Sequence, residues 1–170
     1  TNNFQGAVGI TGAVVSVVDA GAIILGASTV SGTYSVTAGG AITNSGALAI
    51  ASAAATFAAT SSYDITLNNA SNNFATVIIT SGNNVTLVDA GAIALGASTV
   101  SGTYSVTAPG AVTQSGALAI TGATTISASG YNVTLNEATN NFVGAVGITG
   151  AVVSVVDAGA IILGASTVSG

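Results

Sequence analysis

The side chains best able to do chemistry in this chain are five carboxylates, since the sequence contains no Lys, Arg, His or Cys. Three of them, Asp19, Asp89 and Asp157, lie in the same tetrapeptide V-D-A-G, at spacings of 70 and 68 residues. Carboxylates can act as general acids and bases, and their oxygens are ligands for Ca²⁺. Whether these three could cooperate depends on the elements that position them.

The same spacing runs through the whole sequence as an internal repeat. Residues 1–32 return at 139–170 with one change, Gln5 to Val143, and a looser copy spans 71–102. A fixed period of this length is typical of an array of stacked units, each burying its apolar face on the next. We therefore expect one continuous solenoid over residues 1–170, with modules at about 1–70 and 71–138 and a partial module at 139–170.

The local pattern within a module predicts short β-strands. Apolar side chains alternate with small or polar ones, as around Ile23 and Leu25 or Leu48 and Ile50, and a period of two is that of a strand. Gly recurs every few residues and costs about 1 kcal/mol inside a helix, so even the Ala-rich segment 51–60 is interpreted as strand. The strands expected in the first module are 14–19, 22–25, 28–31, 34–38, 41–44, 48–51, 56–59 and 64–68, with a ninth piece after Asn72–Asn73.

Nine pieces per module group into three coils of three strands. The predicted fold is therefore all-β: a right-handed parallel β-helix (β-solenoid) with about three coils per 68–70-residue repeat. Inward Val, Ile and Leu would form ladders along the axis, about 4.8 Å apart. One register stays open, because after Phe74 either Thr76 and Thr80 point inward or a one-residue shift buries Val77 and Ile79 instead.

This fold separates the carboxylates. Equivalent positions three coils apart would lie about 14 Å from one another, too far to share an ion or a catalytic centre. We interpret Asp19, Asp89 and Asp157 as surface turn residues, and Asp64 and Glu137 are not even equivalent to each other. With no His, Lys or Cys to build a nucleophile, a phosphate loop or a metal cluster, we predict that the chain is not an enzyme. No catalytic, cofactor-binding or metal-binding residue is expected.

The composition also narrows the partners. Charged residues make up 3% of the chain and none is a cation, so the contacts to phosphate that dominate nucleic-acid binding are missing. No apolar run reaches the roughly 20 residues of a membrane-spanning helix. We therefore expect neither a nucleic-acid partner nor membrane insertion.

The remaining aromatic and polar residues are interpreted structurally. Rings recur in register, as at Tyr34 and Tyr104, and we expect them to fill wide core positions, with sugar stacking as the alternative. Paired Asn residues such as Asn72–Asn73 suit left-handed turns and amide ladders. Thr does not recur coil by coil in the sequence, so no ice-binding row is expected.

Two segments, 18–50 and 88–120, share the pattern V-D-A-G-A-I-x-L-G-A-S-T-V-S-G-T-Y-S-V-T-A-x-G-A-(I/V)-T-(N/Q)-S-G-A-L-A-I. This style of repeat resembles that of filamentous-haemagglutinin-type surface proteins, which are giant bacterial β-helix adhesins and exoproteins. The resemblance implies secretion and a place outside the cell, on a bacterial surface.

The function expected from these observations is that of an extracellular structural fibre or stalk. Exposed edge strands normally carry charges that oppose end-to-end pairing, and neither end of this sequence carries them. We therefore expect self-association along the axis, as separate subunits or as one giant chain, with lateral packing as a further mode. The alternative is an adhesin that binds glycans or cell surfaces through exposed faces of the solenoid.

Overall fold

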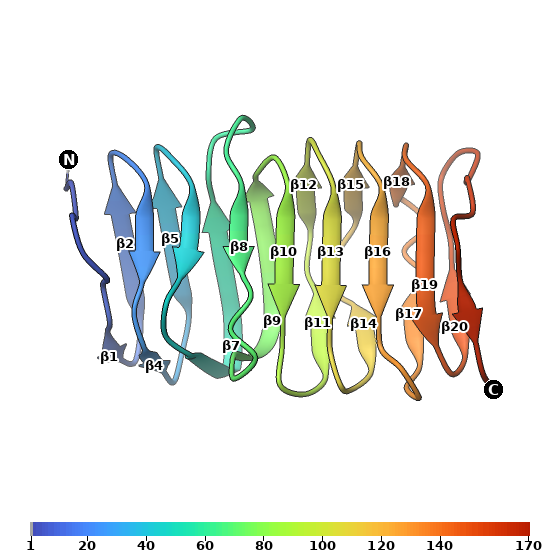
Figure 1. The fold of residues 1–170 in the computed structure, drawn as a ribbon, viewed down its shortest axis with the longest axis horizontal. Coiled ribbons are helices and arrows are strands. Elements are labelled where there is room, and N and C mark those ends of the chain that lie inside the picture. The colour runs from blue at the N-terminus through green and yellow to red at the C-terminus, as the bar shows by residue number, and fades with distance from the viewer. Residues whose placement is uncertain (1) are drawn as a thin grey trace.

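The structure, a computed structural model, describes residues 2–170. The chain winds about eight times around one axis, and each complete turn places one strand segment on each of three sides (Figure 1). The paired strands are parallel throughout. The predicted all-β solenoid is therefore confirmed. Among the residues described, no helix has the length and apolarity that a membrane crossing requires.

We call the near face in Figure 1 side A. It is a continuous eight-stranded ladder with one strand from each turn. Its strands are β3 (Ile23–Leu25), β6 (Ile42–Asn44), β8 (Ile65–Leu67), β10 (Val85–Val88), β13 (Tyr104–Thr107), β16 (Thr124–Ser127), β19 (Val146–Gly150) and β21 (Thr167–Val168).

The other two sides, B and C, follow side A in that order along each turn. Two long strands, β7 (Leu48–Ala58) and β9 (Asn73–Ser81), turn a corner, so that their first parts lie on side B and their second parts on side C. Side B also contains β1 (Thr11–Gly12), β4 (Ser28–Val30), β11 (Ile93–Leu95), β14 (Val112–Gln114), β17 (Val133–Leu135) and β20 (Val153–Val155). Side C also contains β2 (Val15–Asp19), β5 (Tyr34–Ala38), β12 (Ser98–Val100), β15 (Leu118–Ile120) and β18 (Asn141–Phe142).

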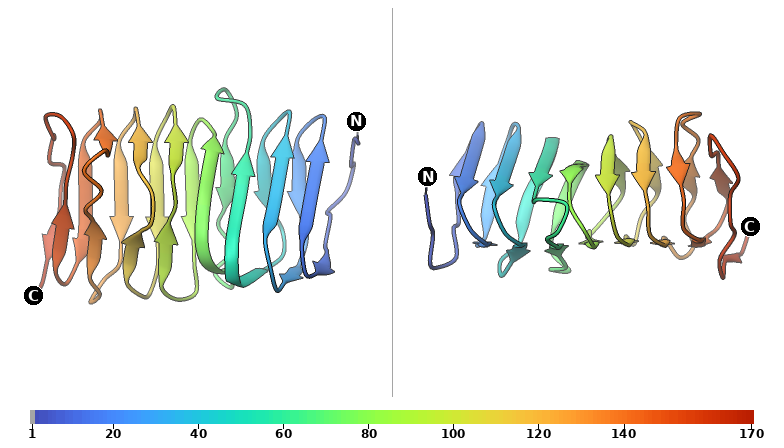
Figure 2. Two further views of the ribbon diagram at one scale, coloured as in Figure 1. Left: turned by 180° about the vertical axis from the view of Figure 1, so that it is seen from behind. Right: turned by 90° about the horizontal axis from the view of Figure 1, so that it is seen from above.

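The coil is right-handed, as predicted. In Figure 1 the near strands of side A run downward and the far strands of side C run upward, while the chain advances from left to right. Figure 2 shows the same stack from behind and from above, with the two ends of the chain at opposite ends of the rod.

The core lies inside the coil and is uninterrupted. Alternate residues of each strand point inward, and together they form one hydrophobic cluster that extends from Val15 to Ile148. In its N-terminal half Phe57 packs edge-on between Tyr34 and Phe74, with ring centroids 6.1 and 6.2 Å apart. The prediction that recurring rings fill the core is therefore confirmed at these positions.

The sequence repeat and the structural turn differ in length. The segment V-S-V-V-D of the first module is β2 on side C, its equivalent V-T-L-V is β10 on side A, and the equivalent V-S-V is β20 on side B. Along the chain from β2 to β10 the backbone passes from one side of the coil to the next ten times, because β7 and β9 each occupy two sides. Three full turns would require only nine such passages. About three coils per repeat is confirmed, but the predicted nine pieces are ten. Each module is therefore rotated by about a third of a turn relative to the previous one.

The register left open after Phe74 is the shifted one. Val77 and Ile79 are completely buried, whereas Thr80 is exposed and Thr76 is half-buried. The pairing of β7 with β9 is irregular in two places: between Ile50 and Ala54, which pair with Phe74 and Thr76, and again near the end of both strands, where β9 skips one residue. The shift has a simple cause, because the other register would have placed two hydroxyl groups in the apolar core at a cost of about 1–3 kcal/mol each.

Glycines at one corner allow successive coils to approach closely. A Cβ atom on Gly122 would overlap the carbonyl group of Gly102, and that carbonyl accepts a hydrogen bond of 2.9 Å from the backbone N–H of Gly122 itself. Neither atom can move without breaking the ladder. We expect Gly122→Ala to lower the free energy of unfolding by about 1–3 kcal/mol, measured by chemical denaturation. Gly6→Ala is the matched control, because no heavy atom lies within 4 Å of its added Cβ; an equal loss there would contradict the explanation.

Candidate functional site

The three equivalent carboxylates lie at three different corners of the coil and act on the backbone. Asp89 is 2% exposed, its Oδ1 accepts the backbone N–H of Phe74 at 2.7 Å, and its Oδ2 accepts that of Gly91 at 2.9 Å. Asp157 and Asp19 receive the corresponding bonds from the residues equivalent to Phe74. Asp19 is the last residue of β2, and Asp89 and Asp157 directly follow or nearly follow a strand. The prediction of surface residues is wrong for Asp19 and Asp89, because these carboxylates accept hydrogen bonds from N–H groups inside the corner.

A buried amide side chain lies beside the corner of Asp89 and another beside the corner of Asp157. The side chain of Asn72 is fully buried: its Oδ1 accepts from Asn44 Nδ2 at 2.8 Å and from the Leu48 N–H at 3.0 Å. Its Nδ2 donates to the carbonyl oxygens of Leu67 and Val88, at 3.2 and 3.3 Å. Asn72 thereby joins three successive turns. Asn140 has the equivalent role, with partners in Gln114, Leu118, Leu135 and Val156.

The structural interpretation of the Asn residues is correct in one respect and wrong in another. Amide contacts along the axis do occur, since Asn84 Oδ1 accepts from the N–H and the hydroxyl of Thr103, and Asp64 Oδ1 accepts from Asn84. Left-handed turns at Asn do not occur among residues 2–170, where the one positive φ belongs to Gly130, at 79°. The remaining acid, Glu137, is exposed.

Burial gives Asp89 a predictable influence on stability. Desolvation raises the pKa of Asp89 above its ordinary value of 3.8, although the backbone N–H groups of Phe74, Gly91 and Ala90 oppose the rise. A carboxyl group with a raised folded pKa contributes stability that is complete below 3.8 and is lost as the pH rises through the folded pKa. No side-chain cation exists whose ion pairs acid could break.

We therefore expect the melting temperature to rise as the pH falls from about 7 to about 4, measured by circular dichroism. Asp89→Asn should flatten this dependence, because the titrating group is removed. A melting temperature that falls in acid would contradict the assignment.

The other residues singled out by their spacing divide between core and surface. Tyr104 is completely buried, and burial raises the pKa of its hydroxyl. Tyr63 and Tyr131 are 47% and 49% exposed, so these two rings do not fill the core. No group of three or more acidic, His or Cys side chains within residues 2–170 is arranged to hold a metal ion.

The expectation that Thr does not recur from coil to coil is wrong on side A. The outward positions Thr43, Thr66, Thr86, Ser105 and Thr125 occupy consecutive rungs of the ladder. The rotation of successive modules hid this row in the sequence, because each member comes from a different part of the repeat. A parallel row two residues further along is broken by Asn68 and Val88, so side A does not present a regular array two rows wide.

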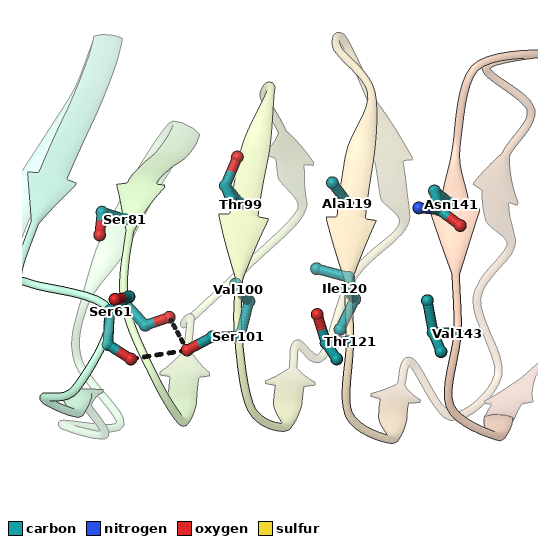
Figure 3. A pocket seen from close by; sticks show the side chains of 11 residues that line it. Ser61, Ser81, Thr99, Val100, Ser101, Ala119, Ile120, Thr121, Asn141 and Val143 are labelled. Carbon is teal, nitrogen blue, oxygen red and sulfur yellow. Dashed lines mark hydrogen bonds between the residues drawn. The ribbon is translucent and has the colours of Figure 1, made fainter.

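The outer face of side C carries a trough (Figure 3). It runs along the rod axis between two rows of outward side chains and has a volume of about 150 Å³. Ser81, Thr99, Ala119 and Asn141 form one wall, and Ser61, Ser101, Thr121 and Val143 form the other. The floor is made by Gly82, Val100 and Ile120, whose side-chain positions face the core.

One end of the trough is closed by the turn that contains Ser61. The Ser101 hydroxyl donates a 2.7 Å hydrogen bond to the backbone carbonyl of Ser61 and holds the turn over the sheet. The equivalent turn of the second module is one residue shorter and uses Gly130 at positive φ to turn tightly. The first-module turn has no Gly and is wider, and this accounts for its overhang.

Sequence reasoning missed the trough. Its walls come from five successive turns, and their alignment requires the ladder register of side C, in which Thr99 pairs with Ala119 and Ala119 with Asn141. The single available signal was the longer spacing from Ile50 to Tyr63 than between their equivalents in the second module.

Comparison with known proteins agrees with the repeat. The profile of a family described as Repeats of unknown function (DUF5649) matches residues 11–81 and, a second time, residues 82–149. No curated protein matches the chain, and no solved structure matches it. The two matches together cover more than half of the residues.

Proposed function

We propose that this chain, which belongs to the family of repeats of unknown function (DUF5649), forms part of an extracellular structural fibre or stalk on a bacterial surface. One observation supports the proposal most: the hydrophobic core is a single cluster from Val15 to Ile148, and the ladder of side A pairs eight parallel strands in succession. Stacked repeats of this kind contact only their neighbours, so a rod can lengthen by adding turns without any change in its cross-section. Its style of repeat resembles that of filamentous-haemagglutinin-type proteins, and we infer the same kind of role.

The last described turn has apolar side chains that internal turns bury. Ile161 and Leu163 are 37% and 74% exposed, whereas their equivalents Ile93 and Leu95 are 2% and 0% exposed. The internal pair is covered because β14 stacks on β11. A further coil of the same kind, from a continuing chain or from a second copy, would bury the exposed pair in the same way.

The polar groups are consistent with a structural role. The corner carboxylates are used as acceptors for backbone N–H groups, and the buried amides join neighbouring turns. We accordingly infer that the protein is not an enzyme, and that its principal partner is itself.

The length of the rod tests the proposal. Because residues 139–170 repeat residues 1–32, a second copy of residues 33–170 can follow residue 170 without changing the phase of the repeat. These added residues correspond to two modules, so we expect the rod to lengthen by about 32 Å at constant cross-section, as measured by small-angle scattering and cryo-electron microscopy. A second compact body or an unchanged length would refute the fibre.

Self-association is measured separately. If separate subunits dock end to end, sedimentation should show oligomers that grow with concentration, and electron micrographs should show filaments of constant width. A chain that stays monomeric at high concentration and unfolds cooperatively would exclude docking of separate subunits, and the length measurement would then decide whether one long chain forms the fibre.

The second candidate function is that of an adhesin, and the trough on side C favours it. The trough is a shaped, uncharged depression lined by hydroxyl and apolar groups, and concave sites of this mixed kind are where small ligands bind.

A further inference from the structure

We propose that the trough on side C binds the terminal sugar ring of a neutral glycan. The inference deepens the adhesin candidate by naming the ligand class, and it does not depend on the fibre, whose length is measured separately. It is argued from the charge, the hydrogen-bonding groups, the size and the shape of the trough.

The charge of the lining excludes ionic ligands. None of the eleven lining residues carries a charge, and the chain as a whole has a net charge of −5 without any cation. An anionic ligand would meet no positive partner, and a cation would find no carboxylate in the walls. A neutral ligand avoids the cost of leaving a charge unpaired.

The walls can both donate and accept hydrogen bonds. Within the described residues the hydroxyls of Ser81, Thr99 and Thr121 and the amide of Asn141 have no hydrogen-bond partner in the protein, so they are available to a ligand. The Ser101 hydroxyl uses its proton on Ser61 and can therefore accept. Beside these polar groups lie the exposed apolar side chains of Ala119 and Val143. A sugar ring suits such a lining, because it has hydroxyls on its rim and C–H groups on its faces.

The size of the trough fits one ring. The volume of about 150 Å³ allows one small ring to lie partly in the trough, with the rest of the ligand in solvent. The turn that carries Ser61 closes one end, and Asn141 and Val143, at the last strand of side C, mark the other (Figure 3). A chain could not pass through the closed end, so the ring that lies against Ser61 is a terminal one.

The first module provides a natural comparison. Its equivalent rows lie on side B, where Thr29 pairs with Ala49 in the same way that Thr99 pairs with Ala119 on side C. There Ala51 replaces Thr121, which removes one of the polar groups. Substitutions in these rows therefore serve as matched controls for substitutions in the trough.

The test uses the 170-residue chain and four neutral probes: cellotetraose, tetra-N-acetylchitotetraose, mannotetraose and galactotetraose. Isothermal titration calorimetry should detect binding of at least one probe. Ala119→Phe, which fills the trough with a ring, should weaken this binding at least about tenfold, whereas Ala49→Phe should leave it unchanged. Replacement of Thr60–Ser62 by Ser-Gly, the turn of the second module, should also weaken binding, because it removes the overhang of Ser61.

Three outcomes would overturn the inference. The first is the absence of binding by all four probes at about 10 mM. The second is equal binding by the Ala119→Phe and Ala49→Phe variants. The third is competition by the neutral peptide Gly-Ser-Thr-Ser-Gly at the same concentration as the best sugar, which would show that the trough prefers peptides. Circular dichroism of both Phe variants confirms that a loss of binding is not a loss of fold, and none of these outcomes alters the length of the rod.

Discussion

Asn72→Ala is expected to lower the free energy of unfolding by about 3–5 kcal/mol, one of the two largest effects that we predict for a single substitution. The amide of Asn72 is fully buried and makes four hydrogen bonds that join three successive turns. Alanine would remove all four and leave the N–H of Leu48 and the carbonyls of Leu67 and Val88 without these partners inside the coil. Each buried polar group left in this state costs about 1–3 kcal/mol.

The neighbouring residue gives the matched control. Asn73 is exposed, so Asn73→Ala should change the free energy of unfolding by no more than about 0.5 kcal/mol. Both values are obtained from urea denaturation followed by circular dichroism. Similar losses for the two variants would mean that the buried amide has no special role in joining the turns.

Phe57→Ala is expected to cost about 3–5 kcal/mol, because it empties a completely buried position. The ring of Phe57 lies between those of Tyr34 and Phe74 in two edge-on contacts. The ladder hydrogen bonds fix the spacing of the turns, so the neighbouring turns cannot collapse into the space. A cavity therefore remains, and its cost adds to the lost transfer free energy.

Phe4→Ala is the control for this substitution, since Phe4 is 38% exposed and no turn in the described residues lies beyond it. We expect a loss of less than about 1 kcal/mol from the same chemical change. Thermal denaturation by calorimetry measures both. If Phe57→Ala proved as mild as Phe4→Ala, the coil would be able to contract, and the rigid stacking of turns would be wrong.

Much of the fold could be predicted from the sequence because apolar residues recur at the inward positions of the strands and small or polar residues at the outward positions. Alternating pairs such as Ile23 and Leu25 marked strands that are buried at every second residue, and the Ala-rich segment 51–60 is largely strand, within β7, as expected. Local alternation decides both features, so no distant contact was needed to predict them.

The features that the sequence could not reveal depend on how one turn meets the next. Nothing local shows that β9 turns a corner and so adds a tenth segment to the module. Burial of Asp89 depends on a chain segment fifteen residues earlier, whose N–H at Phe74 it accepts. The trough needs four turns in register and a turn lengthened by one residue around Ser61. Each of these is a relation between turns, which spacing along the chain does not contain.

The ten-segment module determines how a long array would present its surface. Since each module is displaced by one side, a given group of outward residues follows a spiral, and returns to the same side only after three modules, or ten turns, which is about 48 Å of rod. A flat target lying along the rod could therefore engage only every third copy of any one group. Copies of the group would face all three directions around the rod, so targets on any side could be bound. Such an array is suited to binding separate targets around it, and it gains little avidity for one flat surface.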